Sequence, residues 1–473
     1  MSGPILIADL FCGAGGTSAG AVRALNRLGL AHELVCVNHW AVAIETHTRN
    51  HPEARHHCVD LATARPEAIV PEGRLDLLVA SPTCTYHSRA RAGKPTTDQQ
   101  RMDPWHVVTW ATSLEVDRIM VENVPEFMDW GPVDAETGKP DPSRRGEYFG
   151  AWIAALEAIG YDVESRILNC ADYGDATTRQ RFFLLGRRRG RPIRWPSPSH
   201  APAEKAAALG RRPWRPAREI IDWSLPSESI FTRARPLSEK TLARIAAGLA
   251  KFGGAAAEPF LVVLRNHCDA RGLDPGSWPG AGLPPADANL QGSLTGSPPA
   301  MVIGQHGGAT ARPVDRPVPT IATLGAVSLV EPFMVPNFGE RDGQPPRVHA
   351  LDDPLPTVTS RGAGNLIQPM LTAYYGANAG CKPVTEPMDT VTTKDRFGLV
   401  EPDAGPPVDI RYRMLQPHEL AGAMSFDADY DFAGTKTEIK RQIGNAVPTR
   451  TAEALIGAAF AEEAGGAGGR AAA

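Results

Sequence analysis

The sequence has little of what defines several protein classes. Its seven cysteines are scattered over 473 residues, with no C-x-x-C pair and no Cys/His cluster at zinc-finger spacing. A disulfide scaffold and a structural zinc site are therefore not expected, and we predict that no metal is bound. A chain of this length buries enough apolar surface to fold without such cross-links.

The chain also lacks long apolar runs and a strong excess of charge. No apolar stretch approaches the roughly 18 residues that cross a bilayer, and Asp9 interrupts the apolar core that a signal peptide needs. We therefore expect a soluble, cytoplasmic protein with no membrane partner. The formal net charge of −4 excludes a uniformly basic protein that wraps nucleic acid, but it is compatible with a local basic face.

Strand-like and helix-like segments alternate in the first half of the chain. The strand-like runs are 5–11, 33–38, 75–80, 118–121, 161–169 and 181–185, and helical spacing occurs in 19–28, 41–50, 105–115 and 149–159. This alternation predicts an α/β fold with a doubly wound, mostly parallel sheet. Ligands of such sheets bind at the carboxyl ends of the strands.

The next segment, residues 187–218, is rich in arginine and contains one acid, Glu204. Trp195 and Trp214 are interleaved with the basic residues, a composition that suits a phosphate backbone. A solvated arginine-rich linker would have the same composition, so both interpretations stay open. The basic residues are Arg187, Arg188, Arg189, Arg191, Arg194, Lys205, Arg211, Arg212, Arg215 and Arg218.

An internal repeat occupies about 290–402. Thr320-Ile-Ala-Thr, followed after a short connection by Leu329-Val-Glu-Pro, recurs in similar form at 357–369 and 390–402. Each unit has two β-prone runs around the connection, which predicts a hairpin. Stacked hairpins would form a smaller β-rich module that either recognises a ligand or is purely structural.

A glycine-rich loop follows the first predicted strand, in Asp9-Leu-Phe-Cys-Gly-Ala-Gly-Gly16. A strand that ends in glycines and leads into a helix lets backbone amides approach a ligand closely. Dinucleotide sites, S-adenosylmethionine sites and merely tight turns share this pattern.

Side chains that could take part in catalysis follow later strands. Cys84 comes shortly after strand 75–80, where a thiolate could face a ligand, although a lone cysteine is more often a small buried hydrophobe. Glu122 follows strand 118–121 at the same edge of the predicted sheet. Arg179 and Arg181 end a motif that begins at Asp172, and the segment 441–448 leads into a final helix.

In this order the motifs resemble those of the C5-cytosine DNA methyltransferase family. The resemblance covers Asp9 to Pro198 and Arg411 to about Phe460. It implies a class I S-adenosylmethionine-dependent methyltransferase fold with a smaller, β-rich target-recognition domain. The expected boundaries are a catalytic domain at 1–198, a recognition region at 199–408, C-terminal motifs at 409–460 that return to the catalytic domain, and a disordered tail at 461–473.

The resemblance also implies S-adenosylmethionine as cofactor and a set of residues that bind it. The family commonly has an acid for the ribose where this chain has His39. The implied cofactor-binding residues are Phe11, Gly13, Gly15, Gly16, His39, Trp40, Asp60, Pro82, Asn445 and Val447.

The implied reaction is consistent with the residues that would carry it. Cytosine C5 is a poor nucleophile, and addition of a thiolate to C6 makes the ring enamine-like. By match to the family, Cys84 is this nucleophile, Glu122 is the acid that hydrogen-bonds N3, and Arg179 and Arg181 are the arginine pair, with Arg181 on O2. The target base has to leave the duplex to be reached.

The expected partner is double-stranded DNA, bound by a monomer in a bacterial or phage-infected cell, as in restriction-modification. Segment 81–97 has the basic, flexible composition of a loop that closes over flipped DNA. The predicted DNA-binding residues are Ser88, Arg89, Arg91, Lys94, Arg211, Arg212, Arg215, Arg361, Asn365, Lys394 and Arg396.

Three alternatives remain at this point. A tRNA cytosine-5 methyltransferase would use the same chemistry, although the long repeated region favours DNA. A non-catalytic DNA-binding relative would tend to have lost Cys84 or Glu122, and both are present. The glycine loop alone would also suit a nicotinamide oxidoreductase.

Overall fold

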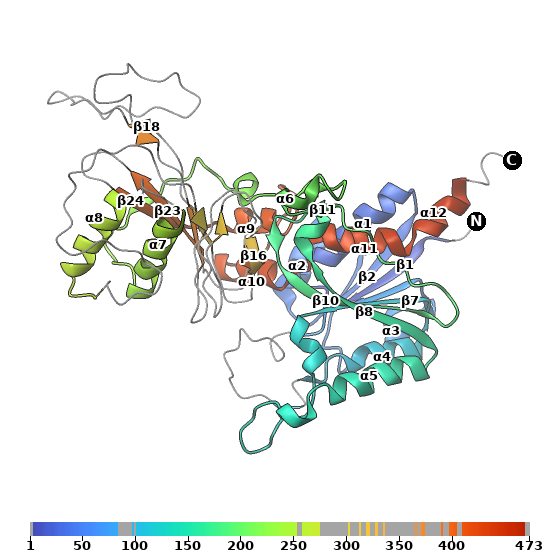
Figure 1. The fold of residues 1–473 in the computed structure, drawn as a ribbon. Coiled ribbons are helices and arrows are strands. Elements are labelled where there is room, and N and C mark those ends of the chain that lie inside the picture. The colour runs from blue at the N-terminus through green and yellow to red at the C-terminus, as the bar shows by residue number, and fades with distance from the viewer. Residues whose placement is uncertain are drawn as a thin grey trace.

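The computed structural model describes residues 3–83, 97–98, 101–252, 258–274 and 409–468, and between 301 and 403 the strands alone. Figure 1 shows a large α/β part and, beside it, a smaller β-rich part that carries α7 (Glu239–Phe252) and α8 (Glu258–Asp269). None of the helices described is long and apolar enough to span a membrane.

The α/β part is built on a seven-stranded sheet with the order β3-β2-β1-β5-β7-β10-β8. The pairs among β3, β2, β1, β5 and β7 are parallel, whereas β10 runs antiparallel to both of its neighbours. The predicted doubly wound, mostly parallel sheet is thereby confirmed. The strands are β1 (Ile5–Leu10), β2 (His32–Asn38), β3 (Arg55–Cys58), β5 (Leu77–Ala80), β7 (Arg118–Asn123), β8 (Tyr161–Asn169) and β10 (Gln180–Arg188).

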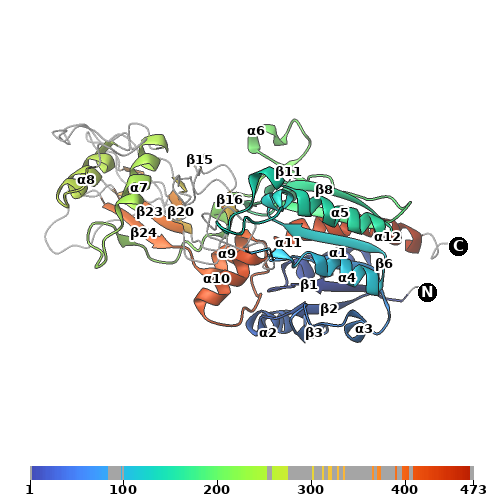
Figure 2. The ribbon, with the colours of Figure 1, turned by 90° about the horizontal axis from the view of Figure 1, so that it is seen from below.

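Helices cover both faces of this sheet, as Figures 1 and 2 show. Successive side chains of β1 alternate between the two faces, because a strand has a period of two residues. Leu6 and Leu10 pack with Trp110 of α4 (Trp105–Ser113) and Trp152 of α5 (Glu147–Ala158). Ile7 packs on the other face, with α1 (Gly16–Leu28) and α11 (Thr449–Ala459).

The shorter elements connect these layers or lie outside them. They are α2 (Ala41–Asn50), α3 (Pro66–Ile69), α6 (Ala203–Ala206), α9 (Pro417–Ala423), α10 (Lys436–Asn445), β4 (Arg74–Leu75), β6 (Glu115–Val116), β11 (His200–Ala201), β12 (Arg212–Pro213), β14 (Met301–Val302), β15 (Arg312–Pro313), β18 (Met334–Val335) and β19 (Asn365–Leu366).

Of the predicted disordered tail at 461–473, residues 461–468 are described, and they are helical. Helix α12 spans Ala461–Gly468. Glu462 forms an ion pair with Arg194, and Glu463 with Arg118. These acids in the first turn also complement the positive end of the helix dipole, so a segment of low complexity gains regular structure.

The β-rich part contains a five-stranded sheet with the order β13-β24-β17-β20-β23. Its strands are β13 (Glu228–Ser229), β17 (Val327–Leu329), β20 (Met370–Ala373), β23 (Phe397–Asp403) and β24 (Asp409–Met414). Strand β24, where the predicted C-terminal motifs begin, pairs within this sheet.

Among the described strands, the two runs of the first repeat unit, and those of the third, pair with other segments rather than with each other. The first run of one unit forms β16 (Val318–Ile321), which pairs in parallel with β22 (Asp389–Thr390) of another unit and with β9 (Thr177–Thr178) of the α/β part. The second runs, in β17 and β23, pair with each other in the five-stranded sheet. A short connection can cross between two sheets as readily as it can reverse the chain, and the sequence pattern does not distinguish the two.

Helices α1 and α11 approach each other at glycines of α1. A Cβ atom added to Gly16 would lie 2.3 Å from the carbonyl oxygen of Val447, and one added to Gly20 would lie 2.6 Å from Cβ of Ala452. Backbone contact at this distance is possible only for glycine. The C-terminal helix is thus seated on the helix that follows the glycine loop.

We predict that Gly16→Ala destabilises the protein by about 1–3 kcal/mol, because the added methyl group overlaps a fixed backbone oxygen. Gly150→Ala is the matched control, since nothing lies within 4 Å of its added Cβ in α5 and alanine is favoured over glycine in a helix. Denaturant unfolding of both variants checks this. Equal stability of the two would contradict the close approach.

Candidate active site

Four segments that the sequence singled out meet at one edge of the sheet. The glycine loop follows β1, residues 81–83 follow β5, and Glu122 lies near the end of β7. Since β10 is antiparallel to β7, its beginning, at Gln180, lies at this same edge. Cys84 and the predicted DNA-binding residues Ser88, Arg89, Arg91 and Lys94 lie outside the described residues.

Glu122 and Arg181 form a buried ion pair at this edge. Arg181 Nε lies 3.0 Å from Glu122 Oε1, and the two side chains are 4% and 7% exposed. Burial raises the pKa of Glu122 above its usual 4.5, although the charges of Arg181 and Arg179 oppose this. The protonated carboxyl group is therefore easier to form here than in water, which suits a group that donates a hydrogen bond.

Asn123 fixes the chain segment that leads to Cys84. Its Nδ2 donates to the carbonyl oxygen of Pro82 at 3.2 Å, and its Oδ1 accepts from the backbone N–H of Val124 at 2.8 Å. Pro82 is buried. The end of β7 thus positions the turn after β5 as well as the glutamate.

Arg179 contacts the C-terminal segment through its Nη1, which donates to the carbonyl oxygen of Gly444 at 3.1 Å. Its charge also lowers the pKa of Glu122. The two predicted catalytic arginines therefore differ: Arg181 pairs with the glutamate directly, and Arg179 also joins the active-site edge to α10.

Asp175 is a structural anchor that the sequence reasoning missed. Its Oδ2 accepts from Thr451 N at 3.1 Å and Thr451 Oγ1 at 2.6 Å, and its Oδ1 accepts from Arg450 N at 3.3 Å. The carboxyl group thereby binds amides in the first turn of α11 and holds the segment that leads to Arg179. Burial raises its pKa to about 6.

A pocket at the same edge brings together Phe11, His39 and Asp60, three of the predicted cofactor-binding residues. It has about 460 Å³ of space free of protein atoms, including solvent at its mouth. The sequence reasoning missed the other lining residues, which are Asn38, Val59, Leu61, Asp103 and His106.

The lining of this pocket fits S-adenosylmethionine. Phe11, Val59 and Leu61 offer apolar surface for a flat base, and the Asp60, Asp103 and Asn38 oxygens can accept hydrogen bonds from hydroxyl and amino groups. The two carboxylates also suit a ligand with cationic groups.

The remaining predicted cofactor residues are not among those that line this pocket. Gly13 and Gly15 have φ angles of 53° and 87°, and Gly16 begins α1. Trp40 stacks under the Arg441 guanidinium at 4.5 Å. Val447 is buried against Gly16, and Asn445 is exposed at the end of α10.

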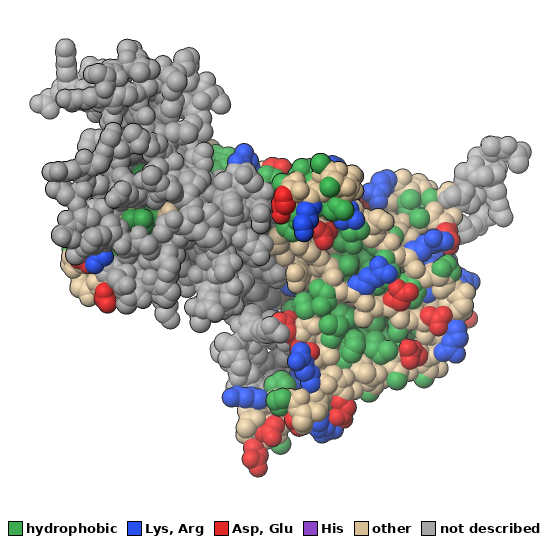
Figure 3. Space-filling model, viewed as in Figure 1, with side chains coloured by type: hydrophobic (Ala, Val, Ile, Leu, Met, Phe, Trp, Pro, Cys, Tyr) green, Lys and Arg blue, Asp and Glu red, His purple; other side chains and the backbone are tan. Residues whose placement is uncertain are grey.

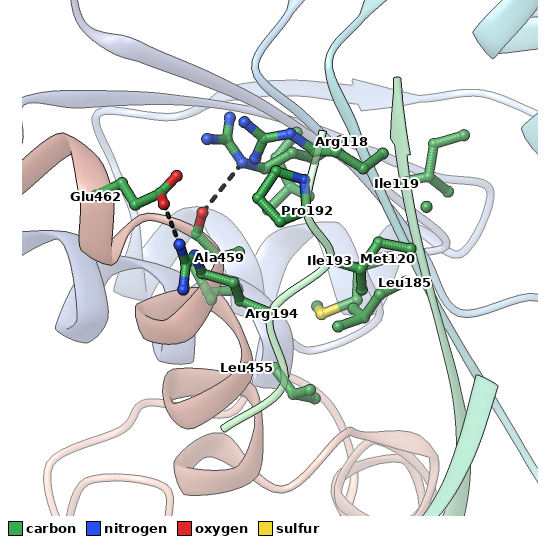
Figure 4. A pocket seen from close by; sticks show the side chains of 14 residues that line it. Arg118, Ile119, Met120, Leu185, Pro192, Ile193, Arg194, Leu455, Ala459 and Glu462 are labelled. Carbon is green, nitrogen blue, oxygen red and sulfur yellow. Dashed lines mark hydrogen bonds and ion pairs between the residues drawn. The ribbon is translucent and has the colours of Figure 1, made fainter. Parts of the chain in front are cut away.

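A second pocket lies at the opposite edge of the sheet (Figure 4). Arg118, where β7 begins, lines it, whereas Glu122 lies near the other end of that strand. Arg194 and Glu462 pair at its rim, and Arg118 Nε donates to the carbonyl oxygen of Ala459. It therefore lies apart from the predicted catalytic residues.

Much of the basic segment 187–218 is engaged in ion pairs. Asp117 Oδ1 lies 2.9 Å from Arg191 Nη1, and Asp117 Oδ2 lies 3.6 Å from Arg187 Nη2. Arg215 Nε lies 2.8 Å from Glu219 Oε2. Figure 3 shows acidic and basic side chains interspersed over the visible face of the α/β part. Part of the arginine content is thus structural.

The structure describes only some of the other predicted DNA-binding residues. Arg212 is exposed and Arg211 half-buried, so both stay predictions. Arg361, Lys394 and Arg396 lie outside the described residues, and Asn365 is described only by its place in β19.

Asp9 is a buried acid beside the glycine loop. It is 2% exposed, and its Oδ2 accepts a hydrogen bond from Ser18 Oγ at 2.7 Å. Burial raises the pKa of Asp9 to about 7. This carboxyl group connects β1 to α1 and is neutral over part of the physiological pH range.

Comparison with known proteins identifies the family. The family described as C-5 cytosine-specific DNA methylase matches residues 5–208 and 356–461. The chain belongs to this family. The match leaves residues 209–355 outside it.

Individual relatives of the family are distant. The chain is similar to the type II methyltransferase M.Sau3AI of Staphylococcus aureus, with 25% identity over 191 residues, 38% of this chain and 43% of that protein. It is 30% identical to M.XorII of Xanthomonas oryzae pv. oryzae over 207 residues, 42% of this chain and 44% of that protein. These matches span less than half of either relative.

A solved structure of a methyltransferase from Entamoeba histolytica, EhMeth, superposes with a TM-score of 0.46 at 10% identity, over 98% of this chain and 99% of that one.

We predict that Asp9 contributes a decline in the free energy of unfolding as the pH rises from about 4 to about 7. The folded protein retains a proton on Asp9 that the unfolded chain releases near 3.8, so rising pH favours unfolding in this window. Asp9→Asn should remove this part of the decline and keep the contact with Ser18. Asp162→Asn, at an exposed position of β8, is the control. A decline of equal size in wild type and Asp9→Asn would contradict the prediction.

Proposed function

We propose that this protein transfers a methyl group from S-adenosylmethionine to C5 of a cytosine in duplex DNA, through a covalent bond between Cys84 and C6. The observation that carries the proposal is the buried pair of Glu122 and Arg181, at 3.0 Å, at the sheet edge that also holds the pocket of Phe11 and Asp60. Membership of the C-5 cytosine-specific DNA methylase family supports it.

Phe11, His39 and Asp60 would hold the cofactor, and the glycine loop would approach it with backbone amides. When bound, S-adenosylmethionine supplies a methyl group electrophilic enough to react with an activated C5. His39 offers the ribose a ring nitrogen in place of the carboxylate that is common in the family. His39 is exposed and lies beside Asn38 in the pocket lining, so either of these two side chains can contact the ribose.

Cys84, as a thiolate, adds to C6 and moves electron density toward N3 and O2 of the ring. The Glu122 carboxyl group, protonated more readily because of its burial, donates a hydrogen bond to N3. The Arg181 guanidinium orients that carboxyl group and stabilises charge on O2. After methyl transfer, loss of the C5 proton to a base and release of Cys84 restore the aromatic ring.

The DNA contacts are assigned to the segment that follows Pro82 and to the β-rich part. A base in duplex DNA is out of reach of Cys84, so it has to be flipped into the site. Strand β16 of the β-rich part pairs with β9, immediately before Arg179. This pairing supports a role for the β-rich part in presenting DNA to the same edge.

Cys84→Ser should abolish the denaturation-resistant adduct that wild type forms with DNA containing 5-fluorocytosine, because fluorine at C5 blocks the final elimination. Binding of S-adenosylmethionine should change little, since Cys84 acts on the base. Cys58→Ser, at an exposed thiol, is the control and should retain the adduct. An adduct formed by Cys84→Ser would overturn the assignment of the nucleophile.

Glu122→Gln should lower kcat by roughly 100-fold or more, because the variant loses the acidic proton and about 3 kcal/mol of transition-state stabilisation. Glu115→Gln, at an exposed position in β6, serves as control. Steady-state kinetics on duplex DNA measure both variants. Activity of Glu122→Gln within a few-fold of wild type would show that another group acts on N3.

A further inference from the structure

A second group of reactive side chains lies behind the glycine loop, outside the lining of the cofactor pocket. Cys36 of β2 is directly opposite His56 of β3, and Asp9 of β1 is directly opposite Cys36. Paired residues of neighbouring parallel strands project to the same face of a sheet. His47 of α2 completes the group, so residues that form no motif in the sequence meet in one place.

The donor atoms of three of these residues are close enough to share an ion. Cys36 Sγ and one ring nitrogen each of His47 and His56 all lie within 4.8 Å of one another. His47 Nδ1 and His56 Nε2 are 2.9 Å apart. Cys36 and His47 are fully buried, and His56 is half-buried.

The contact between the two histidines leaves part of the buried His47 ring without a partner. The contact between His47 and His56 satisfies one nitrogen of His47, whereas its buried Nε2 has no hydrogen-bond partner among the described residues. Buried polar atoms are rarely left in this way. Nε2 of the neighbouring His51 is also buried without a hydrogen-bond partner among the described residues. The ring centroids of His51 and His47 lie 4.8 Å apart.

Other polar side chains lie next to this group. The Cys12 thiol hydrogen-bonds Cys36. Asp9 and Ser18 are the other polar groups nearby, and Ser18 Oγ lies 3.9 Å from Cys36 Sγ.

We propose that Cys36, His47 and His56 form a binding site for Zn²⁺. One thiolate and two neutral imidazoles are donors that zinc prefers, and structural sites of this kind hold the ion tetrahedrally. Binding replaces the Cys36 thiol proton, which passes to solvent. Two nitrogens at 2.0–2.1 Å from one zinc ion lie about 3.3 Å apart, so the two histidine rings have to separate by a few tenths of an ångström.

The ion would join three elements that frame the cofactor site. Cys36 belongs to β2, His56 to β3 and His47 to α2. The His47 ring also lies 3.0–3.2 Å from the position that a Cβ atom of Gly15 would occupy. A bound ion would therefore hold this ring beneath the glycine loop and stabilise the loop.

Titration of the full-length, chelator-treated, reduced protein with Co²⁺ as a spectroscopic substitute for zinc tests this site. We expect one equivalent to bind, with a thiolate-to-cobalt charge-transfer band that Zn²⁺ displaces. Cys36→Ser should abolish the band, and His56→Gln should weaken binding about 100-fold or more, as expected for loss of a ligand when outer contacts alone cost 10–100-fold.

Two neighbours provide matched controls. His57→Gln alters the next residue of β3, which projects to the opposite face, and Cys58→Ser removes an exposed thiol. Both should bind cobalt as wild type does, and Zn²⁺ should raise their Tm but leave that of His56→Gln nearly unchanged. Because His56 is only half-buried, His56→Gln should fold, and it provides the test if Cys36→Ser does not fold.

The proposal is overturned if folded wild type binds no stoichiometric cobalt or zinc. It is equally overturned if His56→Gln binds the ion as tightly as wild type, or if the two controls lose binding to the same extent as the ligand variants.

Discussion

The close contact between Gly16 and the Val447 carbonyl oxygen is the constraint on which the active-site edge depends. It seats α11 on α1, and this places the Gly444 carbonyl oxygen where Arg179 binds it and the first turn of α11 where Asp175 binds it. Both contacts hold the segment that ends in Arg181. The contact between Gly16 and Val447 therefore helps to fix the position of Arg181, which pairs with Glu122.

Burial and charge act in opposite directions on Glu122. Removal from water favours the protonated carboxyl group, and the nearby guanidinium groups favour the carboxylate. The balance leaves the pKa raised, while Arg181 still fixes the orientation of the carboxyl group. An acid that is both oriented and easily protonated suits repeated donation to a ring nitrogen.

The sequence predicted the α/β sheet because local signals carry that information. Strand-like runs, helical spacing and glycines after β1 all occur in short windows, and Phe11, His39 and Asp60 indeed line one pocket. The pairing of β16 with β22 and β9 could not be predicted, because it joins segments far apart in the sequence. The same applies to the meeting of Cys36, His47 and His56.

Other features were missed for the same physical reason. Asp103 and His106 line the pocket of Phe11 and Asp60 only because α4 lies beside the loop after β3. Asp175 has no local pattern that distinguishes it from a surface acid. Helix α12 depends on ion pairs of Glu462 and Glu463 with arginines that precede them by more than 250 residues, so its composition alone suggested disorder.

The most direct test of the account is the chemical identity of the product. Purified protein would be incubated with methyl-labelled S-adenosylmethionine and either duplex DNA or tRNA, and the nucleosides from each would be analysed by mass spectrometry. The account predicts label in 5-methyldeoxycytidine from DNA, dependent on Cys84 and Glu122. Label in tRNA alone, on an exocyclic amino group of DNA, or in neither substrate would contradict it.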